Sequence, residues 1–209
     1  MMNIELWIPF ILASTLILII PGPTIILVIS QAVSHGRWSV LPLVTGVVMG
    51  DFTAMTLSFL GLGAVLSTSA VIFGIFKWFG ALYLMYLGIK LWTSSPETNA
   101  IQNTVKEASA KSLLKNSFVV TALNPKSIAF FVAFLPQFLD PTQAVASQFA
   151  LLGGTFLFLG GINAALYAIF AGQLNEHMKK RKIRVWFNRC GGSALVGAGI
   201  VTAGIKQTL

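Results

Sequence analysis

Long apolar runs separated by short polar connectors dominate the chain. These segments can be drawn at about residues 4–33, 38–65, 69–93, 112–138, 145–173 and 186–206. Each is long enough for a transmembrane helix, which needs roughly 20 residues. The pattern predicts an all-α integral membrane protein with six transmembrane helices. A polar stretch at 94–110 separates the first three helices, within 1–93, from the last three, within 111–209.

The composition agrees with a protein that is largely surrounded by lipid. The 209 residues are 56% hydrophobic and 10% charged, with a mean hydropathy of +0.81, whereas soluble domains carry about 25% charged residues. The net charge of +8 comes mostly from Lys and Arg beside the apolar segments. Such clusters are typical of the positive-inside rule, and no motif for binding nucleic acid accompanies them.

The basic residues also predict an orientation. They lie in or beside the connectors at 34–37, 94–111 and 178–185, whereas the connectors at 66–69 and 139–142 hold no Lys or Arg. Because Lys- and Arg-rich loops stay in the cytoplasm, we expect those three connectors there and both termini on the periplasmic side. Lys206 is the residue that disagrees with this orientation.

The triplet Pro21-Gly22-Pro23 interrupts the first apolar segment in a region without charged residues. Proline inside a helix costs roughly 3 kcal/mol or more, so the helix should open here. In lipid, the freed backbone groups must bond to protein or line a water-filled cavity. Asn124-Pro125 interrupts the fourth segment in the same way. Two such breaks in corresponding halves indicate the binding site of a transporter.

Asp51 is the carboxylate expected deepest in the membrane, roughly 20 Å along its helix at 1.5 Å per residue. A carboxylate at that depth costs about 2.5–3.5 kcal/mol on insertion scales and is usually functional. Asp51 would then take up a proton or hold the cationic group of a solute. In the structural alternative it caps broken backbone or pairs with Lys126, and the two interpretations are compatible.

Other residues at similar depth have two interpretations each. Lys126, directly after the second break, belongs to the solute pathway or forms a buried ion pair with Asp51. Asn163 is the corresponding polar residue of the fifth segment, although an Asn can also simply bond to a neighbouring helix. Gly50 follows Gly46 by one helical turn, which favours close helix packing, and it also stands beside Asp51.

The two halves share a weak pattern. Gly80 and Gly88 are eight residues apart in the third segment, and Gly191 and Gly199 have the same spacing in the sixth. Because each half has three predicted spans, the second half would enter the membrane from the opposite side. The chain is therefore expected to consist of two inverted three-helix repeats.

Taken in order, four groups of residues resemble the LysE/RhtB family of bacterial amino-acid exporters. They are Pro21-Gly22-Pro23, Gly46-x-x-x-Gly50-Asp51, Gly80-Ala-Leu-Tyr-Leu-x-Tyr-Leu-Gly88-Ile-Lys90, and Asn124-Pro125-Lys126 with Phe130-Phe131 and Leu135-Pro136-Gln137-Phe138. The resemblance implies a small secondary transporter of the bacterial inner membrane that exports amino acids with the proton gradient. Members often carry Asn where this chain has Thr24, so the resemblance does not define the substrate.

These observations lead to one hypothesis for the mechanism. The expected pathway consists of Pro21, Gly22, Pro23, Gly50, Asp51, Asn124, Pro125, Lys126 and Asn163. Helix N-termini at the two breaks would bind the substrate carboxylate, while Asp51 would exchange the substrate ammonium for a proton. The expected partners are an amino acid, protons and the lipid bilayer, and a homodimer is left open.

Other functions remain as alternatives. The same fold could export another small solute or cation, or the chain could be a membrane interaction protein that transports nothing. An enzyme is not expected, because the predicted spans lack a nucleophile–base pair or a cluster of metal ligands. No cofactor and no metal site is predicted, since Cys190 is alone and both histidines lie near predicted helix ends.

Overall fold

Helices account for every regular element of the described chain. The structure, a computed structural model, describes residues 4–66, 70–93, 108–139, 143–174 and 181–204, and within these ranges no strand occurs. The predicted all-α class is therefore confirmed. The connectors expected at 66–69, 94–110, 139–142 and 178–185 lie partly outside the described residues, which omit 67–69, 94–107, 140–142 and 175–180.

The first predicted span is broken where the prolines stand. Helix α1 covers Ile4–Ile19 and helix α2 covers Pro23–His35. Between them Gly22 has extended backbone, with φ −98° and ψ −171°, and Pro23 occupies the first turn of α2. Proline fits a first turn because its missing N–H would have no partner in the helix there. The sequence thus ends one helix and starts the next within three residues.

The fourth predicted span is also broken, at Asn124. Helix α5 covers Ala110–Ala122 and α6 covers Pro125–Ala129. The segment Pro125–Phe138, which begins with α6, is bent by 41° relative to α5. The side chain of Asn124 caps α6, since its Oδ1 accepts a hydrogen bond from Lys126 N at 3.0 Å. A π-helical turn, η2 (Phe130–Phe134), and a 3-10 turn, η3 (Leu135–Phe138), continue the segment.

The remaining predicted spans are continuous helices within the described residues. The 3-10 turn η1 (Gly36–Ser39) leads into α3 (Val40–Leu66), and α4 (Ala70–Thr93), α7 (Val145–Ile169) and α9 (Arg181–Gly204) follow. Helix α9 begins at Arg181 rather than at 186, so part of the predicted loop at 178–185 is helical. Arg and Lys are good helix formers, so the charged residues at 181–184 are compatible with a helix that starts there.

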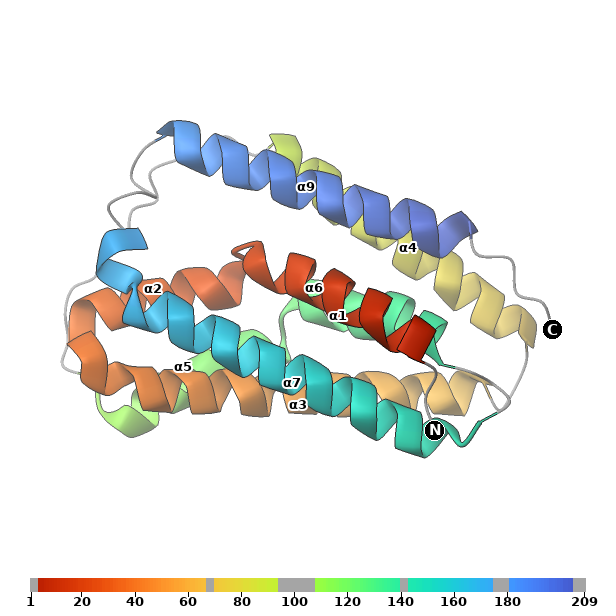
Figure 1. The fold of residues 1–209 in the computed structure, drawn as a ribbon, viewed down its shortest axis with the longest axis horizontal. Coiled ribbons are helices and arrows are strands. Elements are labelled where there is room, and N and C mark those ends of the chain that lie inside the picture. The colour runs from red at the N-terminus through yellow and green to blue at the C-terminus, as the bar shows by residue number, and fades with distance from the viewer. Residues whose placement is uncertain (1–3, 67–69, 94–107, 140–142, 175–180, 205–209) are drawn as a thin grey trace.

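The helices pack as one bundle, with α4 and α9 paired along one side (Figure 1). Helix α3 packs against α5 and α7, and α7 also contacts α1 and α2. The α4–α9 pair is close because glycines face each other across it. A Cβ at Gly88 would lie 2.6 Å from the carbonyl oxygen of Gly192. This is the small-residue packing common between membrane helices.

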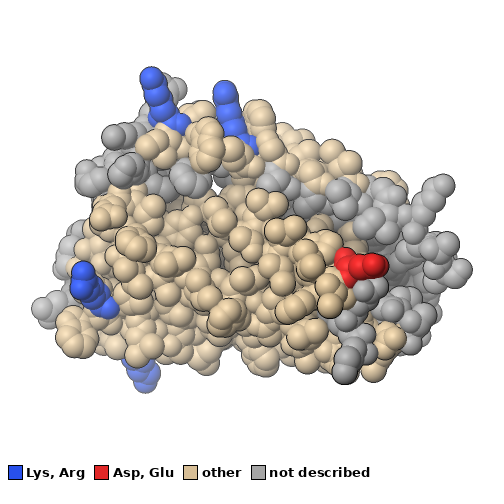
Figure 2. Space-filling model, viewed as in Figure 1, with Lys and Arg blue, Asp and Glu red and all other residues tan. Residues whose placement is uncertain are grey.

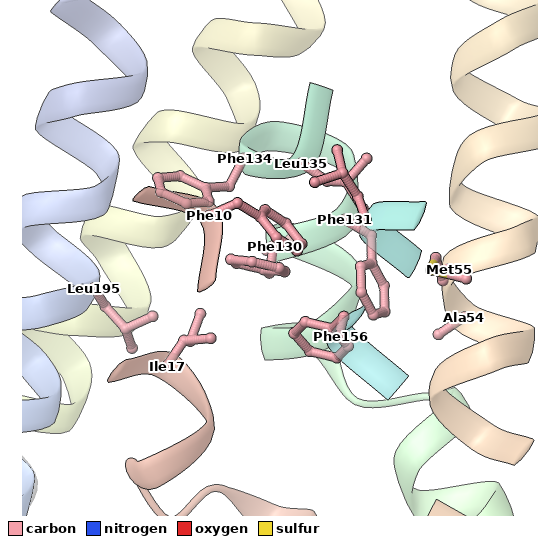
Figure 3. Close-up of a cluster of buried hydrophobic side chains, with 12 residues drawn as sticks. Phe10, Ile17, Ala54, Met55, Phe130, Phe131, Phe134, Leu135, Phe156 and Leu195 are labelled. Carbon is pink, nitrogen blue, oxygen red and sulfur yellow. The ribbon is translucent and has the colours of Figure 1, made fainter. Parts of the chain in front are cut away.

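Two separate clusters of buried side chains fill the bundle. The aromatic cluster, drawn in Figure 3, is built around Phe10, Phe130, Phe131, Phe134 and Phe156. The aliphatic cluster consists of Ile25, Val28, Ile29, Ala32, Leu43, Val47, Leu113, Ala164, Ala168 and Ala171. The first cluster joins α1 and η2 to α7, and the second joins α2 and α5 to α3 and α7.

The surface and helix lengths agree with a membrane protein. Charged side chains are few on the face in Figure 2 and lie near its margins. Among the described residues, the stretches Pro23–Gly61 and Val145–Ile169 are long and apolar enough to cross a membrane. Ala110–Ala122 with Pro125–Phe138 makes a third if the bent pair counts as one span. The number of six spans stays a prediction.

Candidate functional site

The two helix breaks lie against each other. From the first turn of α6, Lys126 reaches the end of α1, where its Nζ donates hydrogen bonds to the carbonyl oxygens of Ile17 at 2.8 Å and Ile20 at 2.7 Å. Gly22 lies beside it, since a Cβ added there would be 3.5 Å from Lys126 Nζ. The break in one half of the chain is thus stabilised by a residue from the break in the other half.

Helix α7 satisfies the other carbonyl groups at the end of α1. Asn163 Nδ2 donates to the carbonyl oxygen of Leu18 at 3.0 Å, and Tyr167 Oη donates to that of Ile19 at 2.6 Å. Together with Lys126, these side chains bond carbonyl groups 17 to 20, which a helix end would leave without partners. The positive charge of Lys126 also suits the negative end of the α1 dipole.

Thr24 forms the second connection between the breaks. Its Oγ1 accepts hydrogen bonds from Asn124 Nδ2 at 3.1 Å and from Thr121 Oγ1 at 3.3 Å. Asn124 therefore has two roles, because its Oδ1 caps α6 while its amide nitrogen bonds to the first turn of α2. These three buried side chains join α2, α5 and α6 at one point.

Asp51 is buried beside these groups, with 4% of its surface exposed. The hydroxyl of Ser127 hydrogen bonds to the carboxylate, which also interacts electrostatically with Lys126. Asp51 Oδ2 would lie 3.5 Å from a Cβ added at Gly160, so it points at the backbone of α7. Asp51 Oδ1 is buried and has no hydrogen-bond partner among the residues that the structure describes. Lys126, by contrast, donates its hydrogen bonds to backbone carbonyl groups in the last turn of α1 and directly after it.

A small cavity connects these side chains. It has a volume of about 30 Å³, which is enough for one or two water molecules at about 10–15 Å³ each and too small for an amino acid. Its walls combine polar and apolar side chains and two glycines: Leu18, Gly22, Thr24, Ile25, Val47, Asp51, Asn124, Lys126, Ser127, Gly160 and Asn163. A larger solute could enter only if the helices moved apart.

The cavity brings together five of the residues expected in the pathway: Gly22, Asp51, Asn124, Lys126 and Asn163. The prolines at 21, 23 and 125 form the breaks without lining the cavity. Gly50 lies in the contact between α3 and α5, because a Cβ there would be 2.6 Å from Thr121 Cβ. Its role in packing is therefore the one that the geometry supports.

Sequence reasoning missed several residues of the site. Thr24 and Ser127 directly follow the motifs at the two breaks, so their positions in the first turns of α2 and α6 were a usable signal. Gly160 and Tyr167 were also missed, although they lie three and four residues from the predicted Asn163 and so share its face of the helix. Within the described ranges, no three His, Cys, Asp or Glu side chains lie close enough together to hold a metal ion.

An apolar helical bundle with a buried polar cavity between two broken helices is the arrangement of a membrane transporter. The LysE type translocator family model matches residues 15–204, and this chain belongs to that family.

Relatives agree with this class over most of their length. An uncharacterized membrane protein of Vibrio cholerae is 33% identical over 98% of this chain and 100% of its own. A homoserine/homoserine lactone efflux protein of Salmonella typhi is 32% identical over 97% of this chain and 98% of its own. A leucine efflux protein of Enterobacter is 32% identical over 83% and 82%. No solved structure matches the chain.

Proposed function

We propose that this protein exports small amino acids, or close derivatives with a free amino group, across the bacterial inner membrane in exchange for protons. Support comes from the family and from the names of relatives, which are efflux proteins for homoserine, homoserine lactone or leucine. These compounds share an amino group, whereas the lactone has no free carboxylate. A buried carboxylate is the group that would recognise their common feature.

The observation that carries the proposal is the unpaired oxygen of Asp51. A buried carboxylate oxygen without a donor is costly, and Asp51 Oδ1 is in that position beside the cavity. A proton or the ammonium group of a solute would satisfy it, but both cannot bind the same oxygen at once. Competition between the two at Asp51 couples the outward movement of solute to the inward movement of protons.

The two broken helices offer groups that match the carboxylate and the side chain of a small amino acid. The N-terminus of α2 has no side-chain cap at Gly22, so its partial positive charge is available to a substrate carboxylate. Leu18, Ile25 and Val47 offer an apolar wall to the substrate side chain. Because the present cavity is too small for an amino acid, it corresponds to a closed state between the inward- and outward-open ones.

Alternating access would follow from two inverted repeats, 1–93 and 111–209, joined by the loop at 94–110. The packing supports a repeat, because equivalent helices make equivalent contacts. In the first half α3 contacts α5 of the second half, and in the second half α7 contacts α1 of the first half. In this arrangement the basic loops at 34–37, 94–111 and 178–185 face the cytoplasm and both termini the periplasm. Reporter fusions at each terminus test this orientation.

The test is transport by purified protein in liposomes loaded with labelled homoserine or leucine, with an imposed pH gradient. Asp51→Asn keeps the shape of the side chain but removes its charge. A lost charge-assisted contact is worth about 1.5–3 kcal/mol, so the rate should fall by roughly tenfold or more. Glu5→Gln makes the same change at the exposed start of α1 and should leave transport unchanged. A wild-type rate and pH dependence in Asp51→Asn would contradict the role of Asp51.

The same assay addresses a second candidate function. Asp51 could also bind the amino group of an organic cation that is not an amino acid. Release of a labelled amine from the liposomes, with the labelled amino acid retained, would favour this alternative if Asp51→Asn abolished the release. No movement of either class would favour a membrane interaction protein.

A further inference from the structure

One buried charge has no part in the exchange proposed for Asp51. The ammonium group of Lys126 lies at the break in α1, where it donates to the carbonyl oxygens of Ile17 at 2.8 Å and Ile20 at 2.7 Å. The carboxylate of Asp51 is close enough to interact with it electrostatically. The ammonium therefore contacts two backbone carbonyl oxygens and interacts electrostatically with the carboxylate of Asp51.

The other neighbours leave room for a cation at this point. Gly22 lies against the ammonium without a side chain, and any Cβ there would come within 3.5 Å of Lys126 Nζ. Asp51 Oδ1 is buried, and no described residue forms a hydrogen bond to it. Backbone carbonyls at the negative end of a broken helix, next to a carboxylate, are the ligands that secondary transporters use for a coupling cation such as Na⁺. Here a lysine side chain fills that place.

We propose that the Lys126 ammonium is a tethered cation that replaces a free coupling cation, so that this transporter works without Na⁺. A free cation at the same oxygens would meet the positive charge of Lys126. Removal of the side chain would leave the two carbonyl groups and Asp51 as a new site for a small cation. The Na⁺ independence rests on the proposed function, whereas the cation site itself does not.

The experiment measures thermal unfolding of purified protein, which needs no substrate. Lys126→Ala removes three methylene groups and the ammonium, a fragment that n-propylammonium matches. Loss of two charge-assisted hydrogen bonds should lower the melting temperature by roughly 5 °C or more. n-Propylammonium chloride should restore at least half of that shift. Lys115 is an exposed lysine of α5, and Lys115→Ala is the matched control. Its melting temperature should stay at the wild-type value and should not rise with n-propylammonium chloride.

Two compounds separate a cation site from simple filling of space. n-Propanol has the same chain length without charge, and tetramethylammonium has the charge without an N–H donor. Neither should raise the melting temperature of Lys126→Ala. Equal recovery with n-propanol would overturn the proposal, because it would reduce Lys126 to a space-filling side chain. Failure of n-propylammonium to restore any stability would overturn it as well.

A measurement on the wild-type protein keeps the proposal testable if Lys126→Ala does not fold. Replacing Na⁺ by choline at constant ionic strength should leave both the melting temperature and the export rate unchanged. A lower melting temperature in choline, or an export rate reduced more than threefold, would overturn the proposal. If Lys126→Ala responds to n-propylammonium but no amino acid is exported, only the proposed function fails, since the cation site is measured without substrate.

Discussion

The aromatic cluster and the aliphatic cluster lie at opposite ends of the same cavity and differ in the side chains that form them. Along α3, Val47 of the aliphatic cluster, Asp51 of the cavity and Ala54 of the aromatic cluster follow in order. Along α7 the order is reversed, from Phe156 through Gly160 to Ala164. The cavity therefore lies between the clusters on both helices.

The clusters also differ in their backbone. The rings of Phe130, Phe131 and Phe134 come from the π-helical turn η2, and such turns are frequent at functional sites. The aliphatic cluster is built from small side chains on regular helices. We expect the aromatic end to open by local changes in η2 and its rings, and the aliphatic end to open only when whole helices move.

The largest expected effect comes from removing a ring of the aromatic cluster. The ring of Phe130 lies 5.2 Å from those of Phe134 and Phe156, centroid to centroid, and Phe130 is 2% exposed. Phe130→Ala should lower the free energy of unfolding by about 3–5 kcal/mol, because a cavity replaces these contacts. The measurement is thermal unfolding in detergent. Phe158→Ala on the exposed face of α7, where Phe158 is 68% exposed, should cost far less, and equal losses would contradict a packed aromatic end.

The second prediction tests the rigidity of helix packing beside the aliphatic end. A Cβ at Gly50 would lie 2.6 Å from Thr121 Cβ and 2.8 Å from the carbonyl oxygen of Phe118. Gly50→Ala should therefore destabilise the protein by about 1–3 kcal/mol through overpacking. Gly61→Ala on the same helix has open space around its Cβ and should be neutral or stabilising by up to about 1 kcal/mol. Similar unfolding curves for the two variants would show that α3 and α5 can slide apart easily.

The helices and their breaks could be predicted because their causes are local. Apolar runs define the spans, and Pro21, Pro23 and Pro125 stop a helix wherever it packs. The start of α9 was missed because the charged residues before Trp186 were interpreted as a loop, although Arg and Lys are good helix formers. The π-helical turn was missed because it depends on how the phenylalanine rings pack in three dimensions.

The candidate site could be predicted as a set of residues but not as a set of bonds. Asp51, Asn124 and Lys126 were found from their depth and their proximity to a break. The carbonyl groups that Lys126 bonds lie more than one hundred positions away, at Ile17 and Ile20, and no local pattern encodes that pairing. Whether the site binds an amino acid stays a prediction.

The third prediction concerns the connection between the two ends. Thr24 Oγ1 accepts hydrogen bonds from Asn124 and Thr121. Thr24→Val keeps the shape but leaves two buried donors without an acceptor, which should cost about 1–3 kcal/mol. Thr53→Val is the control, because the Thr53 hydroxyl bonds only within its own helix, to Met49 O at 2.9 Å. If thermal unfolding gave the same midpoint for both variants, Thr24 would not hold α2 to the second break.

The smallest expected effect lies at the outer edge of the aromatic cluster. Trp7 packs against this cluster and its Nε1 donates to Thr155 Oγ1 at 3.1 Å, which joins α1 to α7. Trp7→Phe keeps most of the ring and loses that hydrogen bond, so the free energy of unfolding should fall by about 0.5–1.5 kcal/mol. Trp38, 94% exposed, provides the control as Trp38→Phe, which makes the same change away from the cluster. If Trp7→Phe cost as much as Phe130→Ala, the aromatic end would depend on its edge rather than on its buried rings, and local movement of η2 would not be enough to open it.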